Sequence, residues 1–239
     1  KAWLTINVIV YDKEISEVEK LCSWAKECKV DAIIAADWAV VLTARKFALS
    51  VHLSVQANVS NFLALEHYSQ WVDAVVLARE LPLSQISAIN EKIKERNLQG
   101  PGKQLIQTEV FVHGALCIGI SGRCGLSLAA YNSSANRGKC FQNCRRTYEL
   151  KDTESGFTIH TDGPYLLSPK DICLLQGLQE LISSGVGILK IEGRGRSADY
   201  TAVTTAVYRE ALDSYKDNKL PTEEQEKLWL ERLSSVFNR

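Results

Sequence analysis

The sequence has none of the features that mark a membrane-spanning or exported protein. No apolar run approaches the roughly 20 residues that a helix needs to cross a bilayer. The first residues, KAWLTINVIVYDKE, lack the basic and cleavage regions of a signal peptide. We therefore expect a cytoplasmic protein with no membrane partner.

An excess of either charge is also absent. Lysine plus arginine and aspartate plus glutamate number 28 each among 239 residues, so no overall field attracts nucleic acid or anionic lipid. Contact with a nucleic acid would have to come from a local patch. The hydrophobic share of 46% and the charged share of 23% are typical of one folded domain with a sizeable core.

Histidine is scarce, and the motifs of common peptidases are missing. The chain has four histidines and contains neither His-Glu-x-x-His nor Gly-x-Ser-x-Gly. His113, at the end of a predicted strand, is the one histidine that we assign as a catalytic candidate. A structural, hydrogen-bonded histidine is an equal alternative.

What the sequence does contain is a regular alternation of short apolar runs and amphipathic stretches. Strands are predicted at 3–10, 31–37, 51–58, 73–80, 107–114 and 186–194, and helices at 15–28, 38–47, 61–71, 83–96 and 200–215. This order predicts an α/β fold with a parallel sheet, either doubly wound or closed as a barrel. In a barrel the carboxyl ends of the strands would meet at one mouth, where substrate binds.

Polar side chains at those strand ends are the candidate site residues. Glu192 and Arg194, which alternate along the last strand, are assigned as catalytic, although a structural Glu–Arg pair is an even alternative. Gln56 and Asn58 are expected to share a strand face and to contact a base or a carbonyl. The remaining candidates for substrate binding are the arginines Arg79, Arg145, Arg146 and Arg196.

Seven cysteines in a chain without an export signal argue against disulfides. Four of them, Cys117, Cys124, Cys140 and Cys144, follow the pattern C-x6-C-x15-C-x3-C. Four thiolates can hold zinc or a 4Fe–4S cluster, and the spacing favours iron–sulfur only slightly. Buried structural thiols are the lesser alternative.

Basic residues crowd the same segment: Arg123, Arg137, Lys139, Arg145 and Arg146. This patch could hold a phosphate or carboxylate. Equally, it could partly neutralise a thiolate cluster and be solvated at the surface.

Three motifs together resemble the collagenase-like peptidase family, the thirty-second family of peptidases of unknown catalytic type. They are EVFVHGALCIGISGRCGLS at 109–127, LSVQANVSN at 53–61 and LKIEGRGRSADYTAVTTAVYREAL at 189–212. The resemblance implies a TIM-type (β/α)8 barrel in which the strand near residue 3 is the third and that near residue 190 the eighth. The chain is thus expected to lack the first two β–α units.

The implied organisation is a barrel domain over residues 1–220, with a cysteine-rich insertion at about 115–185 between the last two strands. Residues 221–239 would form a terminal helix or begin a further module. The absence of methionine, of which about five are usual at this length, adds to the expectation that residues are missing.

The resemblance implies one of several activities. Some members are iron–sulfur enzymes that hydroxylate a pyrimidine in transfer or ribosomal RNA, and the transfer-RNA branch uses the carboxylate prephenate. Others hydroxylate a quinone precursor, but that branch departs at the last cysteine pair, so Cys140 and Cys144 favour the RNA branch. Matching that branch, the four cysteines would be the cluster ligands. A collagenase-like peptidase is the alternative, and a protein partner that completes the site is left open.

Overall fold

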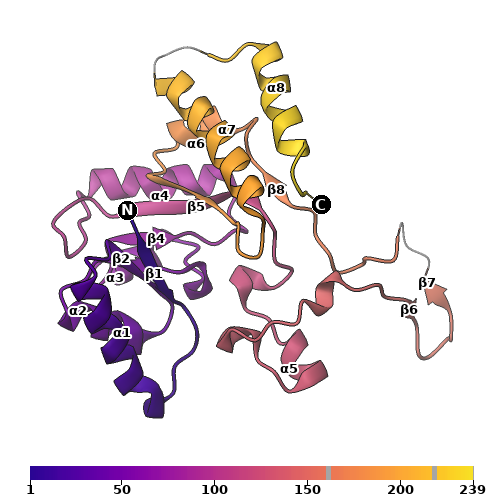
Figure 1. The fold of residues 1–239 in the computed structure, drawn as a ribbon, viewed down its shortest axis with the longest axis horizontal. Helices are drawn as coiled ribbons and strands as arrows, with labels where there is room; N and C mark the ends of the chain where they lie inside the picture. Colours follow the sequence, from indigo (N-terminus) through magenta and orange to yellow (C-terminus); the bar gives the residue numbers. More distant parts are fainter. Residues whose placement is uncertain (160–162, 217–219, 239) are drawn as a thin grey trace.

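The computed structural model describes residues 1–159, 163–216 and 220–238. Strands and helices alternate along the chain, as the apolar periodicity predicts (Figure 1). The parallel strands are β1 (Trp3–Ile6), β2 (Ala32–Ala35), β3 (Val51–Leu53), β4 (Ala74–Val76), β5 (Gln107–Gly114) and β9 (Ile188–Ile191). The helices that follow them are α1 (Ile15–Glu27), α2 (Trp38–Lys46), α3 (Phe62–Tyr68), α4 (Leu83–Glu95) and α7 (Ala198–Lys216).

Side-chain caps mark the starts of two of these helices. Asp37 accepts a hydrogen bond from the N–H of Ala39 at the start of α2, and Asn61 accepts one from the N–H of Ala64 at the start of α3. Such caps satisfy N–H groups that have no partner within the helix. The helices therefore begin where short polar residues follow an apolar run.

The sheet is parallel along the order β1-β2-β3-β4-β5, and β9 extends it in parallel beside β5. A short strand, β8 (Ile172–Cys173), pairs antiparallel with the end of β5. Within the described residues β1 and β9 each pair on one side only. The predicted α/β fold with a parallel sheet is confirmed, and its strand order is compatible with a TIM-type fold, but the described strands do not close a barrel.

One face of the sheet packs against the helices. Its core residues alternate along each strand and include Ile6, Ile33, Ala35, Val51, Leu53, Val75, Val110 and Val112. Side chains between them point the other way because successive residues of a strand face opposite sides. We call this second side the inner face; it carries Trp3, His52, Glu109, Phe111 and Lys190, none of which belongs to the helix-packed core.

Strand β3 is shorter than predicted. It ends at Leu53, and residues 55–57 form a 3-10 turn that ends at Asn58, whose φ is 55°. Gln56 lies within this turn. The prediction that Gln56 and Asn58 share a strand face is therefore wrong, because the period-two rule applies only to extended backbone.

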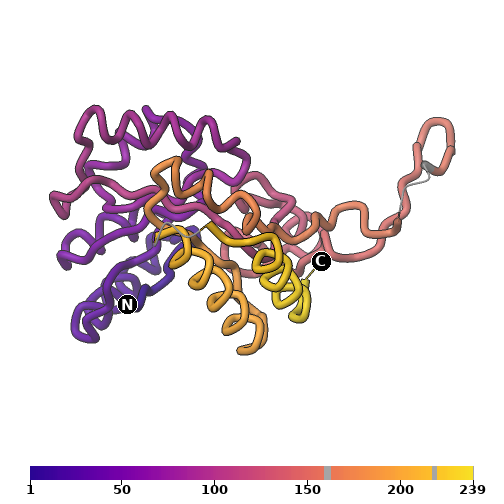
Figure 2. Tube along the Cα trace, turned by 90° about the horizontal axis from the view of Figure 1, so that it is seen from above, coloured from indigo at the N-terminus to yellow at the C-terminus, as the bar shows by residue number. Residues whose placement is uncertain are grey.

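Most of the chain between β5 and β9 has little regular structure. It contains the helices α5 (Leu126–Tyr131) and α6 (Leu178–Ser183) and the hairpin of β6 (Leu150–Lys151) and β7 (Thr158–Ile159). The hairpin projects away from the rest of the chain in two views at right angles (Figures 1 and 2).

The last helix, α8 (Glu223–Ser234), packs against α7. The indole of the buried Trp229 donates to Glu210 Oε2 at 3.0 Å, and Arg232 pairs with the same carboxylate at 2.6 Å. No helix among the described residues is long and apolar enough to cross a membrane.

Gly114 at the end of β5 is required by both its conformation and its surroundings. Its φ is +106°, and a Cβ at this position would lie 2.3 Å from the carbonyl oxygen of Glu192. We expect Gly114→Ala to lower the free energy of unfolding by about 3 kcal/mol, measured by urea denaturation. Gly156→Ala, at φ +71° with open space around it, is the control and should cost about 1 kcal/mol. Equal effects of the two would contradict the steric part of this account.

Candidate functional site

The segment that follows β5, residues 115–147, reaches toward the carboxyl ends of other strands; we call it the cysteine loop. Ile9, after β1, donates its N–H to the carbonyl oxygen of Asn136 at 3.0 Å. Arg123 Nε donates to the carbonyl oxygen of Gln56, after β3, at 2.8 Å. The loop is therefore tied to the edge strand β1 and to the middle of the sheet, on the side where α/β folds bind their ligands.

Ser121 makes a third tie. Its N–H donates to Glu80 Oε1 at 2.8 Å, and its Oγ donates to Asn58 Oδ1 at 2.7 Å. Burial opposes ionisation of Glu80, but the hydrogen bonds from Ser121 and the charge of Arg79 together hold the pKa of this carboxyl below its ordinary value. Asn58, predicted to bind substrate, thus holds the loop in this structure.

Arg137 anchors the loop to the start of α1. Its Nη1 and Nη2 donate to the two Glu14 oxygens at 2.7 and 2.6 Å, and Nη1 also donates to the carbonyl oxygen of Ile9. Its guanidinium carbon lies 4.0 Å from the centroid of the Tyr11 ring. The hydrogen bonds from Arg137 lower the pKa of Glu14 to about 2.

This anchor has a predictable dependence on pH. Because the folded-state pKa of Glu14 is depressed, the pair contributes fully above the ordinary carboxyl pKa of about 4.3 and is lost as the pH falls toward about 2. We expect Glu14→Gln to speed amide hydrogen exchange in residues 115–147 at neutral pH. Glu66→Gln, which removes the outer-surface pair with Arg96, is the control. Unchanged exchange in Glu14→Gln would show that the anchor does not hold the loop.

Three of the four clustered thiols accept a backbone hydrogen bond from the residue two positions along the chain. Cys117, Cys124 and Cys140 each have such an N–H at 3.4 Å from Sγ. N–H donors aimed at sulfur stabilise the thiolate form and tune metal–sulfur centres. The local backbone is thus folded around these sulfurs as thiolate ligands require.

Cys144 is within electrostatic range of the other three thiols. Burial raises the pKa of its thiol, Arg145 lowers it, and the charges of Cys117, Cys140 and Cys124 raise it further. Such electrostatic coupling requires the thiols to be near one another. Within the described residues, no group of three or more His, Cys, Asp and Glu side chains stands in an arrangement that would hold a metal ion. The fit to an iron–sulfur cluster or to zinc therefore lies in the donor set: four thiols on one loop, three of them with N–H partners.

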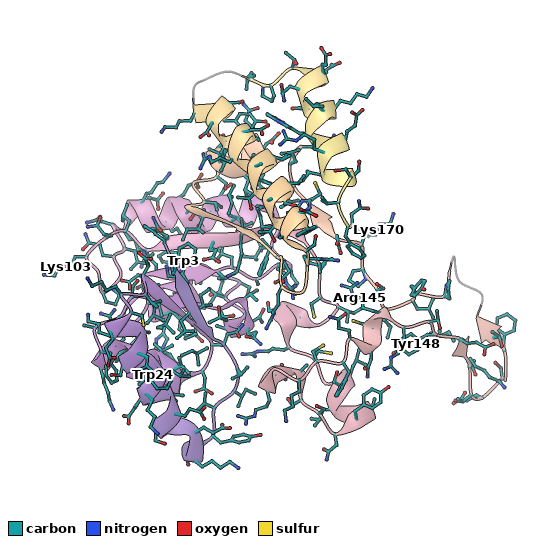
Figure 3. The ribbon with its side chains drawn as sticks, viewed as in Figure 1. Trp3, Trp24, Lys103, Arg145, Tyr148 and Lys170 are labelled. Atoms are coloured by element: carbon teal, nitrogen blue, oxygen red, sulfur yellow. The ribbon has the colours of Figure 1, made fainter. Side chains whose placement is uncertain are left out.

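The guanidinium of Arg145 is hydrogen-bonded to other groups of the protein. It donates to the carbonyl oxygens of Leu116 and Pro169 at 2.6 and 2.8 Å and to Ser168 Oγ at 2.7 Å. Figure 3 shows Arg145 on the side of the cysteine loop that faces Lys170. A cleft of about 420 Å³ adjoins it, lined by Arg145, Tyr165, Ser168, Pro169 and Lys170. Arg145 thus makes three hydrogen bonds within the protein and also lines this cleft.

Arg146, by contrast, lies at the surface. It donates to the Tyr131 hydroxyl, and its guanidinium carbon is 5.3 Å from the centroid of that ring. Of the basic patch predicted from the sequence, Arg123, Arg137 and Arg145 hold the loop to the body, while Lys139 and Arg146 are exposed.

The inner face carries a buried acid that sequence reasoning did not assign. The side chain of Glu109 is only 5% exposed, and its oxygens lie 3.3 Å from His52 Nδ1 and 2.6 Å from Lys190 Nζ. Burial raises the pKa of Glu109, but the hydrogen bond of His52 and the charge of Lys190 outweigh it, so that the pKa is lowered. A charged residue inside an otherwise apolar strand was the signal in the sequence. The ring centroids of Trp3, in β1, and His52 are 5.6 Å apart, so the group of contacting side chains formed by Glu109, His52 and Lys190 continues to Trp3.

Two cations flank one ring at the end of the inner face. Lys190 Nζ lies 5.4 Å and the Arg79 guanidinium carbon 5.7 Å from the centroid of Phe111. Arg79 Nη2 reaches the carbonyl oxygen of Gly119, in the cysteine loop, at 3.5 Å. The predicted substrate residue Arg79 thus lies between the inner face and the cysteine loop.

His113 lies on the opposite side, against the helices. A register shift between Phe111 and His113 turns its side chain toward α7, where it contacts the Tyr200 and Tyr208 rings. Burial lowers the pKa of His113. The Tyr208 hydroxyl lies 3.4 Å from its Nδ1, and the charges of Asp171 and Arg196 also act on the ring. The structure therefore does not bring this catalytic candidate onto the inner face with Glu109.

The candidates after β9 have separate partners. The Glu192 carboxylate accepts the backbone N–H of Arg194 at 2.8 Å, so the two form a local turn rather than an ion pair of side chains. The Arg194 side chain is exposed. Arg196 pairs with the buried Asp171 at 2.9 Å and lies over the rings of Tyr200 and Phe237.

Comparison with known proteins gives three informative relatives. A collagenase of Porphyromonas gingivalis is 42% identical over the whole chain, which covers 58% of that protein. The tRNA hydroxylation protein P1 of Bacillus subtilis is 34% identical over the whole chain and 56% of its own length. The 23S rRNA 5-hydroxycytidine C2501 synthase of Escherichia coli is 35% identical over 90% of the chain and 31% of its own length.

The chain therefore spans less than two thirds of the length of these relatives. No solved structure matches it significantly. The sequence pattern of peptidase family U32 matches all of residues 1–239. This match confirms the resemblance drawn from the three sequence motifs: the chain belongs to peptidase family U32.

Proposed function

We propose that this chain acts in an iron–sulfur-dependent hydroxylase that modifies a pyrimidine in tRNA or rRNA and uses a small carboxylate, such as prephenate, as co-substrate. The observation that carries the proposal is the cysteine loop, where four thiols lie on one segment that is hydrogen-bonded to the residues after β1 and β3. Relatives named for tRNA hydroxylation and for 5-hydroxycytidine synthesis in 23S rRNA support this reaction class.

The four thiols would hold a 4Fe–4S cluster, with zinc as the lesser possibility. A bound cluster supplies electron transfer and activation of an oxygen donor, which side chains cannot provide. The chain's own residues set the position of this centre. Hydrogen bonds of Arg137, Arg123 and Ser121 hold the loop against the rest of the domain. They therefore fix the position of the loop relative to the inner face.

We further propose that the sheet is part of a TIM-type barrel closed by two additional β–α units. Two observations support this. The order β1-β2-β3-β4-β5-β9 matches the third to eighth strands of such a barrel, and among the described residues one side of β1 and one side of β9 are unpaired. In addition, charged and aromatic side chains occupy the inner face, which in a barrel would line the ligand-binding end.

The direct test of RNA chemistry is mass spectrometry of tRNA and rRNA nucleosides from a strain that lacks the gene. One hydroxylated pyrimidine should disappear and should return when the wild-type gene is restored. A nucleoside profile identical to that of the parent strain would contradict the proposal.

A collagenase-like peptidase is the second candidate, and the 42% identity to a protein named collagenase favours it. Purified protein should then hydrolyse gelatin. Hydrolysis that survives Cys117→Ser and Cys124→Ser but is lost in His113→Gln would support the peptidase. An absence of gelatin hydrolysis in the wild type would remove it.

A further inference from the structure

We propose that Arg79, Lys190 and Phe111 form a binding site for a small carboxylate on the inner face, next to the cysteine loop. This inference rests on the function proposed above, because it assigns a place to the carboxylate co-substrate of that reaction. Each of the three residues is partly exposed, so the site is open to a ligand.

Arg79 retains the hydrogen-bonding capacity that a carboxylate needs. No ion pair joins it to an acid within the described residues, and its Nε is buried without a hydrogen-bond partner. Among the described residues it makes one hydrogen bond, a long one of 3.5 Å from Nη2 to the carbonyl oxygen of Gly119. The neighbouring carboxylate of Glu80 is already engaged by Ser121. An arginine fork with free N–H groups binds a carboxylate through two parallel hydrogen bonds.

Lys190 adds a second cation, and its charge is paired with that of Glu109. Glu109 accepts its hydrogen bond at 2.6 Å and fixes the ammonium group beside Phe111. Lysine has three N–H donors, so donors remain for a ligand. Arg79 and Lys190 together carry two positive charges, and the carboxylates of Glu109 and Glu80 offset them. A ligand would therefore be held by directed hydrogen bonds to these donors and not by an excess of positive charge.

The Phe111 ring indicates what the carbon skeleton of the ligand should be. Both cations lie within 6 Å of its ring centroid, so a carboxylate held there would have its carbon skeleton against an apolar surface. The ligand class is therefore a small carboxylic acid with an apolar or unsaturated ring. Since Arg79 also contacts the segment between Cys117 and Cys124, the bound acid would lie beside the thiol-bearing loop.

The chain offers a matched control on its outer surface. Lys92 and Arg96 lie 5.8 and 5.2 Å from the centroid of Phe62, the same arrangement of two cations and a ring. There, Arg96 is paired with Glu66 at 2.8 Å. Removing Arg96 thus repeats the chemical change without touching the inner face.

The test is isothermal titration calorimetry of the anaerobically purified full chain with prephenate, benzoate and inorganic phosphate. Arg79→Gln should weaken prephenate binding at least about tenfold, the usual effect of losing a charge-assisted hydrogen bond. Arg79→Lys should retain more affinity than Arg79→Gln, and Arg96→Gln should bind like the wild type. Phosphate has no carbon skeleton to lie against Phe111 and should bind more weakly than either acid.

Prephenate binding that is unchanged in Arg79→Gln, or absent in the wild type, would overturn the site. Phosphate binding as tight as prephenate binding would also overturn it, in favour of an RNA phosphate site. The calorimetry needs no RNA turnover. Prephenate binding that is weakened in Arg79→Gln would therefore support the site, even if an unchanged nucleoside profile in the deletion strain contradicted the hydroxylase.

Discussion

Replacement of Cys144 by serine is expected to remove the bound iron and to lower RNA hydroxylation at least about 100-fold, because losing a ligand costs more than losing a partner of a ligand. The other three thiols act on Cys144 electrostatically, and it lies on the same loop. Iron and acid-labile sulfide per chain, after anaerobic purification, are the measurements, with the hydroxylated nucleoside as the activity readout.

Cys28→Ser is the matched control. Cys28 is an exposed free thiol at the end of α1 and belongs to another part of the chain. It should leave iron content and hydroxylation unchanged. Retention of full iron content in Cys144→Ser would exclude this thiol as a ligand.

Glu109→Gln is expected to lower the free energy of unfolding by about 3 kcal/mol, as usual when one member of a buried charged group is removed. The change leaves the Lys190 ammonium without its counter-ion and alters the hydrogen bond of His52. Chemical denaturation is the measurement. Glu19→Gln is the control, because Glu19 forms an exposed ion pair with Lys46 at 3.8 Å. It should lower the free energy of unfolding by less than about 1 kcal/mol.

The same substitution should change the dependence of stability on pH. The pKa of Glu109 is depressed in the folded state, so its contribution is present above the unfolded carboxyl pKa of about 4.3 and is lost as the pH falls through the folded value. The wild type should therefore lose stability on acidification more steeply than Glu109→Gln. Parallel pH profiles would show that Glu109 does not carry this charge interaction.

Local signals were sufficient to predict the order of strands and helices. Short β-branched runs such as 107–114 and amphipathic stretches such as 83–96 became β5 and α4 because their periodicity fits burial on a parallel sheet. Strand ends were less predictable. Gln56 falls in a 3-10 turn because Asn58 adopts a left-handed conformation that no alternation rule anticipates.

The roles of the arginines depended on contacts that are distant in the sequence. Arg137 binds Glu14, 123 positions away, and Arg145 binds a segment 24 positions away. Composition shows a basic patch in this segment, but only tertiary structure separates the arginines that hold the loop from Arg146 at the surface. Likewise, strand register alone brings Glu109 of β5 beside Lys190 of β9.

The thiols remain the centre of the proposed function, and their metal content is the most direct test of it. Anaerobically purified protein should contain about four irons and equivalent sulfide per chain, the content of one 4Fe–4S cluster held by four thiolates, with broad visible absorbance that Cys144→Ser abolishes. Stoichiometric zinc without iron in that preparation would contradict the iron–sulfur hydroxylase.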